Sequence, residues 1–452
     1  MRCHATSLSI STSALVFAAA LTQSLTATAP APQAQPQSLP RAPATGAFTG
    51  PGSCAATACH GAVRPVPGSR ILQTEYSVWI AQDRHARAVE VLTNQVSTRM
   101  GRILGIGRAD TAPKCLACHS LDVPEGRQAR SFTSEGVSCE ACHGPASGWL
   151  GPHTTRGWTH QQSVQLGMYD TKDPVKRTER CLSCHLGTAE KQVDHEMIAA
   201  GHPDLVFDLE AFSAAMPRHW REQADDDPFR GVRTFSVGQI VHVRASLDRL
   251  ARRVKGPVWP EYAELECFAC HHSLTRPEDS WRQAHGYDNR RPGTPPLNLS
   301  RWATARHVIA AFEPAAAAEL DAVMAKLNAA GSRLRADADD VVALATRARE
   351  MLDRATARAV AAPIDAAVAR RVLLALAGAA EDIAPRGERA AEQAAMAMES
   401  LYGATAGAGG ASPALKAAFT ELFQQFENPS GYEPRRFVAQ VGRIRALIES
   451  AR

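Results

Sequence analysis

The stretch GVSCEACHGP, residues 136–145, places two cysteines three positions apart, with a histidine directly after the second. The arrangement occurs five times in the 452 residues of the chain. Four copies have the spacing CxxCH, and one, CAATACH, has four residues between its cysteines. In chain order we name them motif 1 (Cys54, Cys59, His60), motif 2 (Cys115, Cys118, His119), motif 3 (Cys139, Cys142, His143), motif 4 (Cys181, Cys184, His185) and motif 5 (Cys267, Cys270, His271).

This spacing indicates covalent attachment of haem c. Two thiols form thioether bonds to the vinyl groups of the porphyrin, and the next residue, a histidine, ligates the iron from below. Two intervening residues let a single helical turn present both sulfurs to one edge of the ring, whereas four require a looser loop. We therefore predict five covalently attached haem c groups, held by the ten motif cysteines, with the five motif histidines as proximal iron ligands.

Three other uses of paired cysteines explain the pattern less well. Disulfides would suit an exported protein, but they give no reason for a histidine after every pair. Zinc ribbons also use CxxC pairs, without an invariable adjoining histidine. A thioredoxin-like redox centre needs one CxxC in an α/β domain, not five. Haem attachment accounts for the cysteine pairs, for the histidine after each pair and for the fivefold repetition.

Composition places the chain among soluble, folded proteins. Hydrophobic residues make up 45% and aromatic residues 6%, and the formal net charge is +4. That charge is too small to indicate nucleic-acid binding. No run of eighteen apolar residues follows residue 30, so no internal membrane span is expected.

The N-terminal part has the features of an exported protein. Arg2 precedes the apolar stretch SALVFAAALTQSL, and small residues follow, which predicts a signal peptide over residues 1–29. No twin arginine is present, so Sec-type export to the periplasm or another extracytoplasmic space is expected. Residues 30–48, rich in Pro, Ala and Gln, are predicted to be a linker.

The fold is predicted to be mainly α, with little sheet. Residues 49–310 are interrupted and loop-rich, typical of a chain that packs short helices around haem. Only the stretch RTFSVGQIVHVRAS, residues 233–246, alternates like a strand. Residues 311–452 lack Cys and His and show apolar residues at helical spacing, which predicts a domain of four to six helices. One of these helices is predicted to begin after the N-cap Ser412.

A second axial ligand is needed on each electron-transfer haem, usually His or Met. Ten histidines remain besides His4 and the motif histidines, enough for every iron. In DHEMIAAGHP two of them stand seven residues apart, about 10 Å if helical, so they could serve two irons but not share one. His242 and His272 remain alternatives, and surface or propionate-contacting roles are expected for His160, His219 and His285. The predicted distal ligands are His85, His153, His195, His202 and His307.

Several of these stretches resemble a known family. GVSCEACHGPASGWLGPH is similar to the third haem segment of the cytochrome c-554 family, tetrahaem electron acceptors of hydroxylamine oxidoreductase. WIAQDRHARAVEVL resembles that family's Trp-then-His helix, and CLSCHLG its fourth motif. The resemblance covers about residues 50–190. It implies that His85 and His153 ligate haems other than their neighbours in sequence, and that the haem of motif 2 lacks a distal protein ligand.

The chain also departs from that family. Motif 1 is widened, motif 5 is added, and a helical tail follows. The segment DHEMIAAGHPDLVFDL has no counterpart, so His195 or His202 could fill the open position at motif 2.

The function expected from these features is electron transfer. Several haems on a small domain must lie close together, and electrons can then pass between them. We expect an extracytoplasmic carrier that serves redox partner proteins, including a membrane-bound or soluble oxidoreductase. The alternatives are an oxidoreductase with one open iron acting on a small nitrogen or sulfur compound, and a structural component of a larger complex.

Overall fold

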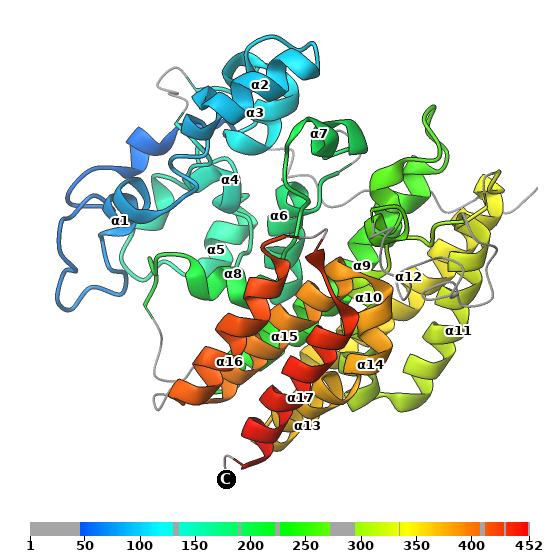
Figure 1. Ribbon diagram of the computed structural model, residues 1–452. Helices are drawn as coiled ribbons and strands as arrows, with labels where there is room; N and C mark the ends of the chain where they lie inside the picture. The colour runs from blue at the N-terminus through cyan, green and yellow to red at the C-terminus, as the bar shows by residue number, and fades with distance from the viewer. Residues whose placement is uncertain are drawn as a thin grey trace, which may run out of the picture. The chain divides into compact units, whose positions relative to one another are not determined.

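Helices supply nearly all regular structure in the described part of the chain (Figure 1). The computed structural model describes residues 46–129, 135–188, 191–221, 227–271, 294–333, 335–406, 412–428 and 431–450. The predicted signal peptide, the linker up to residue 45, His272 and His285 lie outside these residues. Apart from two isolated bridges, Phe48 with Gln128 and Leu265 with Leu297, no β structure occurs among the described residues. The prediction of a mainly α protein is confirmed.

The first half of the described chain forms short helices, and three of them, α3, α4 and α6, carry a motif. These α-helices are α1 Glu75–Gln82, α2 Gln95–Ile103, α3 Pro113–His119, α4 Cys139–His143, α5 His160–Gln165, α6 Pro174–His185, α7 His195–Ala200 and α8 Leu209–Ala215. The short 3-10 helices in the described part of the chain are η1 Pro51–Cys54, η2 Glu90–Thr93, η3 Ala109–Thr111, η4 Pro152–Thr154, η5 Tyr262–Glu264, η6 Cys267–Ala269, η9 Ala384–Arg386 and η11 Gln424–Phe426.

Longer helices follow and build the main apolar core. After α9 Arg230–Arg253 come α10 Ser300–Phe312, α11 Pro314–Gly331, α12 Ala338–Ala361, α13 Ala366–Gly378, α14 Ala380–Ile383, α15 Glu388–Ala406, α16 Pro413–Phe423 and α17 Pro434–Ser450. Seven of these described helices begin after residue 311, one more than the upper expectation, because α14 is a single extra turn. In Figure 1, α13, α15, α16 and α17 lie side by side, from orange to red. No helix in the described part is both long and apolar enough to cross a bilayer.

Side-chain caps explain where several helices begin. A carboxylate or hydroxyl just before a helix accepts hydrogen bonds from its otherwise unpaired first N–H groups. Asp173 does so at α6, accepting from Val175 N at 2.8 Å, and Asp208 does so at α8, accepting from Ala211 N at 2.8 Å. The predicted cap Ser412 accepts from Leu415 N at the start of α16.

The predicted strand over 233–246 is wrong, because these residues lie inside the helix α9. Phe235, Val237 and Ile240, spread around the helix, are all buried. Helices α6, α8, α10, α12 and α15 pack against α9. Because α9 is enclosed by other helices, and buries polar residues such as Gln239 and Asp248 as well as apolar ones, the sequence shows no simple one-sided apolar face. With 24 residues, α9 also exceeds the short helices expected before residue 310.

Polar contacts bind the segment 203–208 to helix α15. Arg389 forms an ion pair with Asp204, and Gln393 donates to the Phe207 carbonyl at 3.2 Å. Ser400 donates to Asp208 at 2.9 Å. This segment, which had no counterpart in the resembling family, is thereby held against the C-terminal helices.

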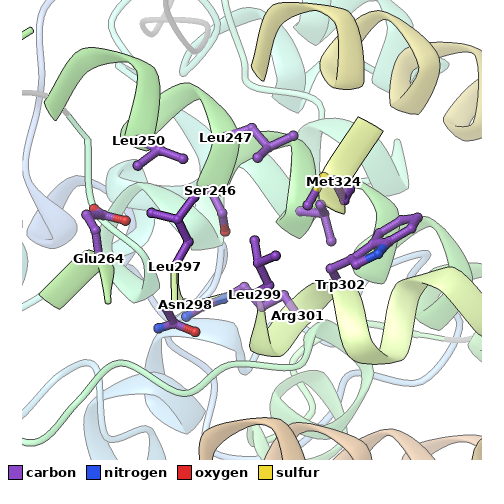
Figure 2. A pocket seen from close by; sticks show the side chains of 11 residues that line it. Ser246, Leu247, Leu250, Glu264, Leu297, Asn298, Leu299, Arg301, Trp302 and Met324 are labelled. Atoms are coloured by element: carbon purple, nitrogen blue, oxygen red, sulfur yellow. The ribbon is translucent and has the colours of Figure 1, made fainter. Parts of the chain in front are cut away.

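A pocket between α9, α10 and α11 lies apart from the motifs (Figure 2). Leu247 and Leu250 of α9, Trp302 of α10 and Met324 of α11 make it largely apolar. Arg301 also lines it and donates to the Leu205 carbonyl at 2.9 Å. None of its lining residues is a cysteine or a histidine.

Candidate haem-binding site

Three of the motifs end an α-helix at the proximal histidine. Helices α3, α4 and α6 each finish with the sequence CxxCH of motifs 2, 3 and 4. Positions i, i+3 and i+4 of a helix share one face, so both thiols and the imidazole of each motif lie on the same side. Pro113 and Pro174, in the first turns of α3 and α6, need no N–H partner there. The local sequence therefore builds the arrangement that haem attachment requires.

The widened motif 1 reaches the same arrangement through a turn. Cys54 ends η1, and Cys59 N then donates to the Ala56 carbonyl at 2.8 Å. Gly61 N donates to the same carbonyl at 3.0 Å. A Cβ on Gly61 would lie 1.9 Å from the carbonyl oxygen of Ala55, so only glycine fits directly after the motif. In motif 5, the 3-10 helix η6 takes the place of the α-helical turn.

Three motif histidines face a histidine from another part of the chain. The ring centroids of His60 and His153 lie 6.1 Å apart, with the rings nearly parallel at 7°. For motif 4, His185 and His85 are 6.2 Å apart, and for motif 2, His119 and His202 are 6.4 Å apart. A metal–imidazole bond is about 2 Å long and the centroid lies about 1 Å beyond the nitrogen, so two imidazoles on one iron have centroids about 6 Å apart. The three gaps fit one iron each.

Hydrogen bonds at Nδ1 orient these rings. A carbonyl oxygen can only accept, so a ring bonded to one through Nδ1 carries its proton there and leaves the lone pair of Nε2 free for a metal. His119 donates to the Ala88 carbonyl at 2.8 Å, His153 to the Leu150 carbonyl at 2.6 Å and His202 to the Pro203 carbonyl at 2.7 Å. Carboxylates hold two more of the six rings: Glu75 accepts from His60 and Asp83 from His85, both at 2.9 Å.

The pKa values of two proximal histidines keep them neutral. Burial, assisted by nearby His85, lowers the pKa of His185 to about 4. Burial is the main cause that lowers the pKa of His143 to about 4, and the nearby His219 and His60 act in the same direction. A histidine must be neutral to ligate a metal, so both rings are in the required state at neutral pH.

His219 is the residue that sequence reasoning missed. After burial, it is the neighbour that lowers the pKa of His143 most, and its Nδ1 donates to the Pro217 carbonyl at 3.2 Å. Its ring contacts Trp220, with centroids 5.2 Å apart. The available signal was a tryptophan close in sequence: Trp220 follows His219, whereas Trp79 and Trp149 stand six and four residues before His85 and His153.

The other predicted distal ligands are placed differently. His195, at the start of α7, contacts the Tyr262 ring at 5.5 Å and faces no motif histidine. His307 lies on α10, and its Nε2 is buried without a hydrogen-bond partner in the described part of the chain. Two further histidines use Nε2 elsewhere: His160 bonds to Asp170, and His242 accepts from Arg301.

Thiols of different motifs touch, which brings the motifs together in pairs. Cys54 of motif 1 is hydrogen bonded to Cys139 of motif 3, and this bond is the main reason why the pKa of Cys54 falls to about 7. Cys184 of motif 4 is hydrogen bonded to Cys118 of motif 2, and this bond lowers the pKa of Cys184 to about 5. Motifs 3 and 4 are also neighbours: burial is the main cause that raises the pKa of Cys181, and the nearby Cys142 of motif 3 raises it further.

The residues present fit haem c. Paired thiols with an adjoining imidazole recur along the chain, and facing imidazoles leave the width of one iron between them. This combination defines a multihaem c-type cytochrome with covalently bound haem. Residues 54–144, from the first cysteine of motif 1 to the glycine after motif 3, match the family model of cytochrome c554 and c-prime. The protein is therefore a multihaem cytochrome that resembles the c554 family.

One curated relative supports the same class. The multiheme cytochrome MtrA of Shewanella baltica (strain OS185) is 27% identical over 169 residues. The match covers 35% of this chain and 45% of that protein, less than half the length of the relative. No solved structure matches the chain.

Proposed function

We propose that the protein is an extracytoplasmic electron carrier with five covalently attached haem c groups, one at each motif. The observation that carries the proposal is the set of three facing imidazole pairs at 6.1, 6.2 and 6.4 Å. Each bound iron accepts and releases one electron, at a potential set by its axial ligands and its surroundings. An iron with two protein ligands has no position left for a substrate, which favours transfer over catalysis.

The axial ligands follow from the facing rings. In this proposal His153 ligates the iron of motif 1, His202 that of motif 2 and His85 that of motif 4. His219 ligates the iron of motif 3. Two observations support this: its Nδ1 bond to the Pro217 carbonyl, and its position near His143, whose pKa it lowers. His195 and His307 remain predictions for the iron of motif 5.

The contacts between motifs define the route. The thiol contacts support an arrangement in which the haems of motifs 1 and 3 are neighbours, and likewise those of motifs 2 and 4. The contact between motifs 3 and 4 joins the two pairs into the order 1–3–4–2. The segment 203–208 links motif 5 to this group. Its Asp204 is close enough to Cys267 of motif 5 to raise the pKa of that thiol, and its Phe207 ring stacks on His185 of motif 4, with centroids 4.9 Å apart.

Partners and location complete the proposal. Signal peptide 1–29 and linker 30–48 would deliver the cytochrome domain, 49–310, and the helical domain, 311–452, to the periplasm. There the protein would exchange electrons with a membrane-bound or soluble oxidoreductase. The helices after residue 311 carry no motif, so a role in docking or support fits them.

An enzymatic function rests on motif 5 alone. An open iron at motif 2, as in the resembling family, is disfavoured because His202 faces His119. At motif 5, no ring contact involving His271 is found within the described residues. An oxidoreductase acting on a small nitrogen or sulfur compound would therefore use that iron.

The number and state of the haems test the proposal. We expect the pyridine haemochrome of the purified protein to give five haems per chain, and the intact mass to include all five. Ferric spectra should be dominated by low-spin haem and should change little with cyanide or nitric oxide. A haem count below four, or a strong high-spin signal that responds to cyanide, would contradict the carrier.

The ligand His85 allows a prediction about potential. Asp83 accepts from its Nδ1 at 2.9 Å and is 5% exposed, and this hydrogen bond raises the pKa of His85. The carboxylate makes the ligand more electron-donating and so favours the ferric state. In Asp83→Asn the midpoint potential of one haem should rise by about 40 mV, which corresponds to about 1 kcal/mol for one electron. Potentiometric titration measures this, with the exposed Asp339→Asn as control; an unchanged potential would exclude the effect.

A further inference from the structure

Arg180 is a half-buried cation with two buried donor atoms that lack a partner within the described residues. It lies on α6, one residue before the first cysteine of motif 4. Its Nε and Nη2 atoms are inaccessible to solvent and have no hydrogen-bond partner among the described residues. Guanidinium does not deprotonate in proteins, and a charge that is buried without a partner is strongly unfavourable. The two donors therefore favour an anion that the described residues do not supply.

Carboxylates close to Arg180 in sequence are already engaged. Glu179, the preceding residue, forms an ion pair with Arg244. Asp170 binds His160 at 2.8 Å. Asp173 caps α6 through its bonds to the backbone at Val175 and Lys176. None of the three can turn to Arg180 without giving up its present contact.

The guanidinium is held in place against the haem motifs. Its carbon Cζ lies 3.9 Å from the centroid of the Tyr169 ring, a cation–π contact. Tyr169 N donates to the carbonyl of His143 at 2.8 Å, and its hydroxyl donates to the Lys176 carbonyl at 2.8 Å. Tyr169 thus ties the cation both to motif 3 and to α6. The charge of Arg180 also acts on Cys142, opposing the rise of that thiol's pKa by burial.

The two unused atoms point to the kind of anion. Nε–H and Nη2–H are parallel donors on one edge of the guanidinium, the edge that pairs with both oxygens of a carboxylate. Haem carries two propionate carboxylates, and in the function proposed above motifs 3 and 4 each hold a haem beside this residue. This edge has no partner among the described residues and lies next to two such sites. A propionate of a bound haem can therefore pair with it.

We propose that Arg180 binds a haem propionate through Nε and Nη2, and that it belongs to the haem of motif 3. This inference rests on the proposed function, since it requires haem at that motif. The cation stabilises the ionised propionate. It also favours the reduced iron, which has one positive charge fewer, and so raises the potential of that haem.

Substitution of Arg180 tests the assignment. In Arg180→Gln the midpoint potential of one haem should fall, and it should become dependent on pH near neutrality, because the unpaired propionate then takes up a proton on reduction. Arg180→Lys, which keeps the charge but loses the paired donors, should restore part of the shift. Arg347→Gln, which removes an exposed charge on α12, should leave every potential unchanged.

The haem count separates the possible outcomes. Wild type without haem would overturn the proposed function itself. A full haem count in Arg180→Gln, with unchanged potentials and no new pH dependence, would overturn only the propionate contact. To identify the haem, the shifted wave is compared with those moved by His219→Met, for motif 3, and by His85→Met, for motif 4. A shift in the wave of motif 4 would contradict the assignment to motif 3.

Discussion

Replacing His202 by alanine will convert one haem of the protein from the low-spin to the high-spin ferric state. In the proposed ligation His202 completes the coordination of the motif 2 iron, with its ring centroid 6.4 Å from that of His119. Nδ1 donates to the Pro203 carbonyl, so only Nε2 is available to the metal. Alanine supplies no donor, and the sixth position becomes open to small ligands. Electronic and paramagnetic resonance spectra, with and without cyanide, measure the change.

His195→Ala is the matched control for this experiment. Both histidines flank the helix α7, but the His195 ring contacts Tyr262 and faces no motif histidine. We expect His195→Ala to leave the motif 2 haem low-spin and unresponsive to cyanide. Because His195 is also a candidate ligand for the motif 5 iron, a high-spin haem in this variant is assigned by comparing its potential with that of the haem changed by His202→Ala. If His195→Ala opens that iron and His202→Ala does not, the two histidines have been assigned the wrong way round.

Replacing Glu140 by alanine will destabilise the protein by about 3–5 kcal/mol, since buried N–H groups left without acceptors cost about 1–3 kcal/mol each. Glu140, within motif 3, is 2% exposed. Its carboxylate accepts from Thr49 N at 2.9 Å, from Gly50 N at 2.7 Å and from Ala146 N at 2.6 Å. Alanine leaves all three backbone N–H groups without their acceptor. It also removes the contacts that hold Thr49 and Gly50, which lead into motif 1.

Denaturant unfolding of the haem-loaded protein measures this loss. Glu90→Ala removes an exposed carboxylate and should change the free energy of unfolding by less than about 0.5 kcal/mol. Glu140→Gln, which keeps one acceptor oxygen, should lie between the wild type and Glu140→Ala. A Glu140→Ala variant as stable as the wild type would show that the three N–H groups find other acceptors, such as water.

Local sequence predicted the elements of the site well. CxxCH contains all three attachment groups within five residues, so a single helical turn arranges them, as α3, α4 and α6 do. The predicted cap Ser412 was also found, because a cap acts only on the next few residues. The strand predicted over 233–246 failed for the opposite reason: α9 is enclosed by helices from other parts of the chain, which removes the one-sided pattern of an exposed helix.

By itself, the sequence determined that haem c is attached covalently and that the fold is mainly helical, because thioether chemistry and helix formation depend on residues close together in the chain. Only the tertiary structure decided which imidazole faces which motif, which thiols touch, and that His202 rather than His195 lies opposite motif 2. It also revealed the unpaired edge of Arg180. Axial ligands and charge partners come from distant segments, and their distances are set by packing that no local pattern encodes.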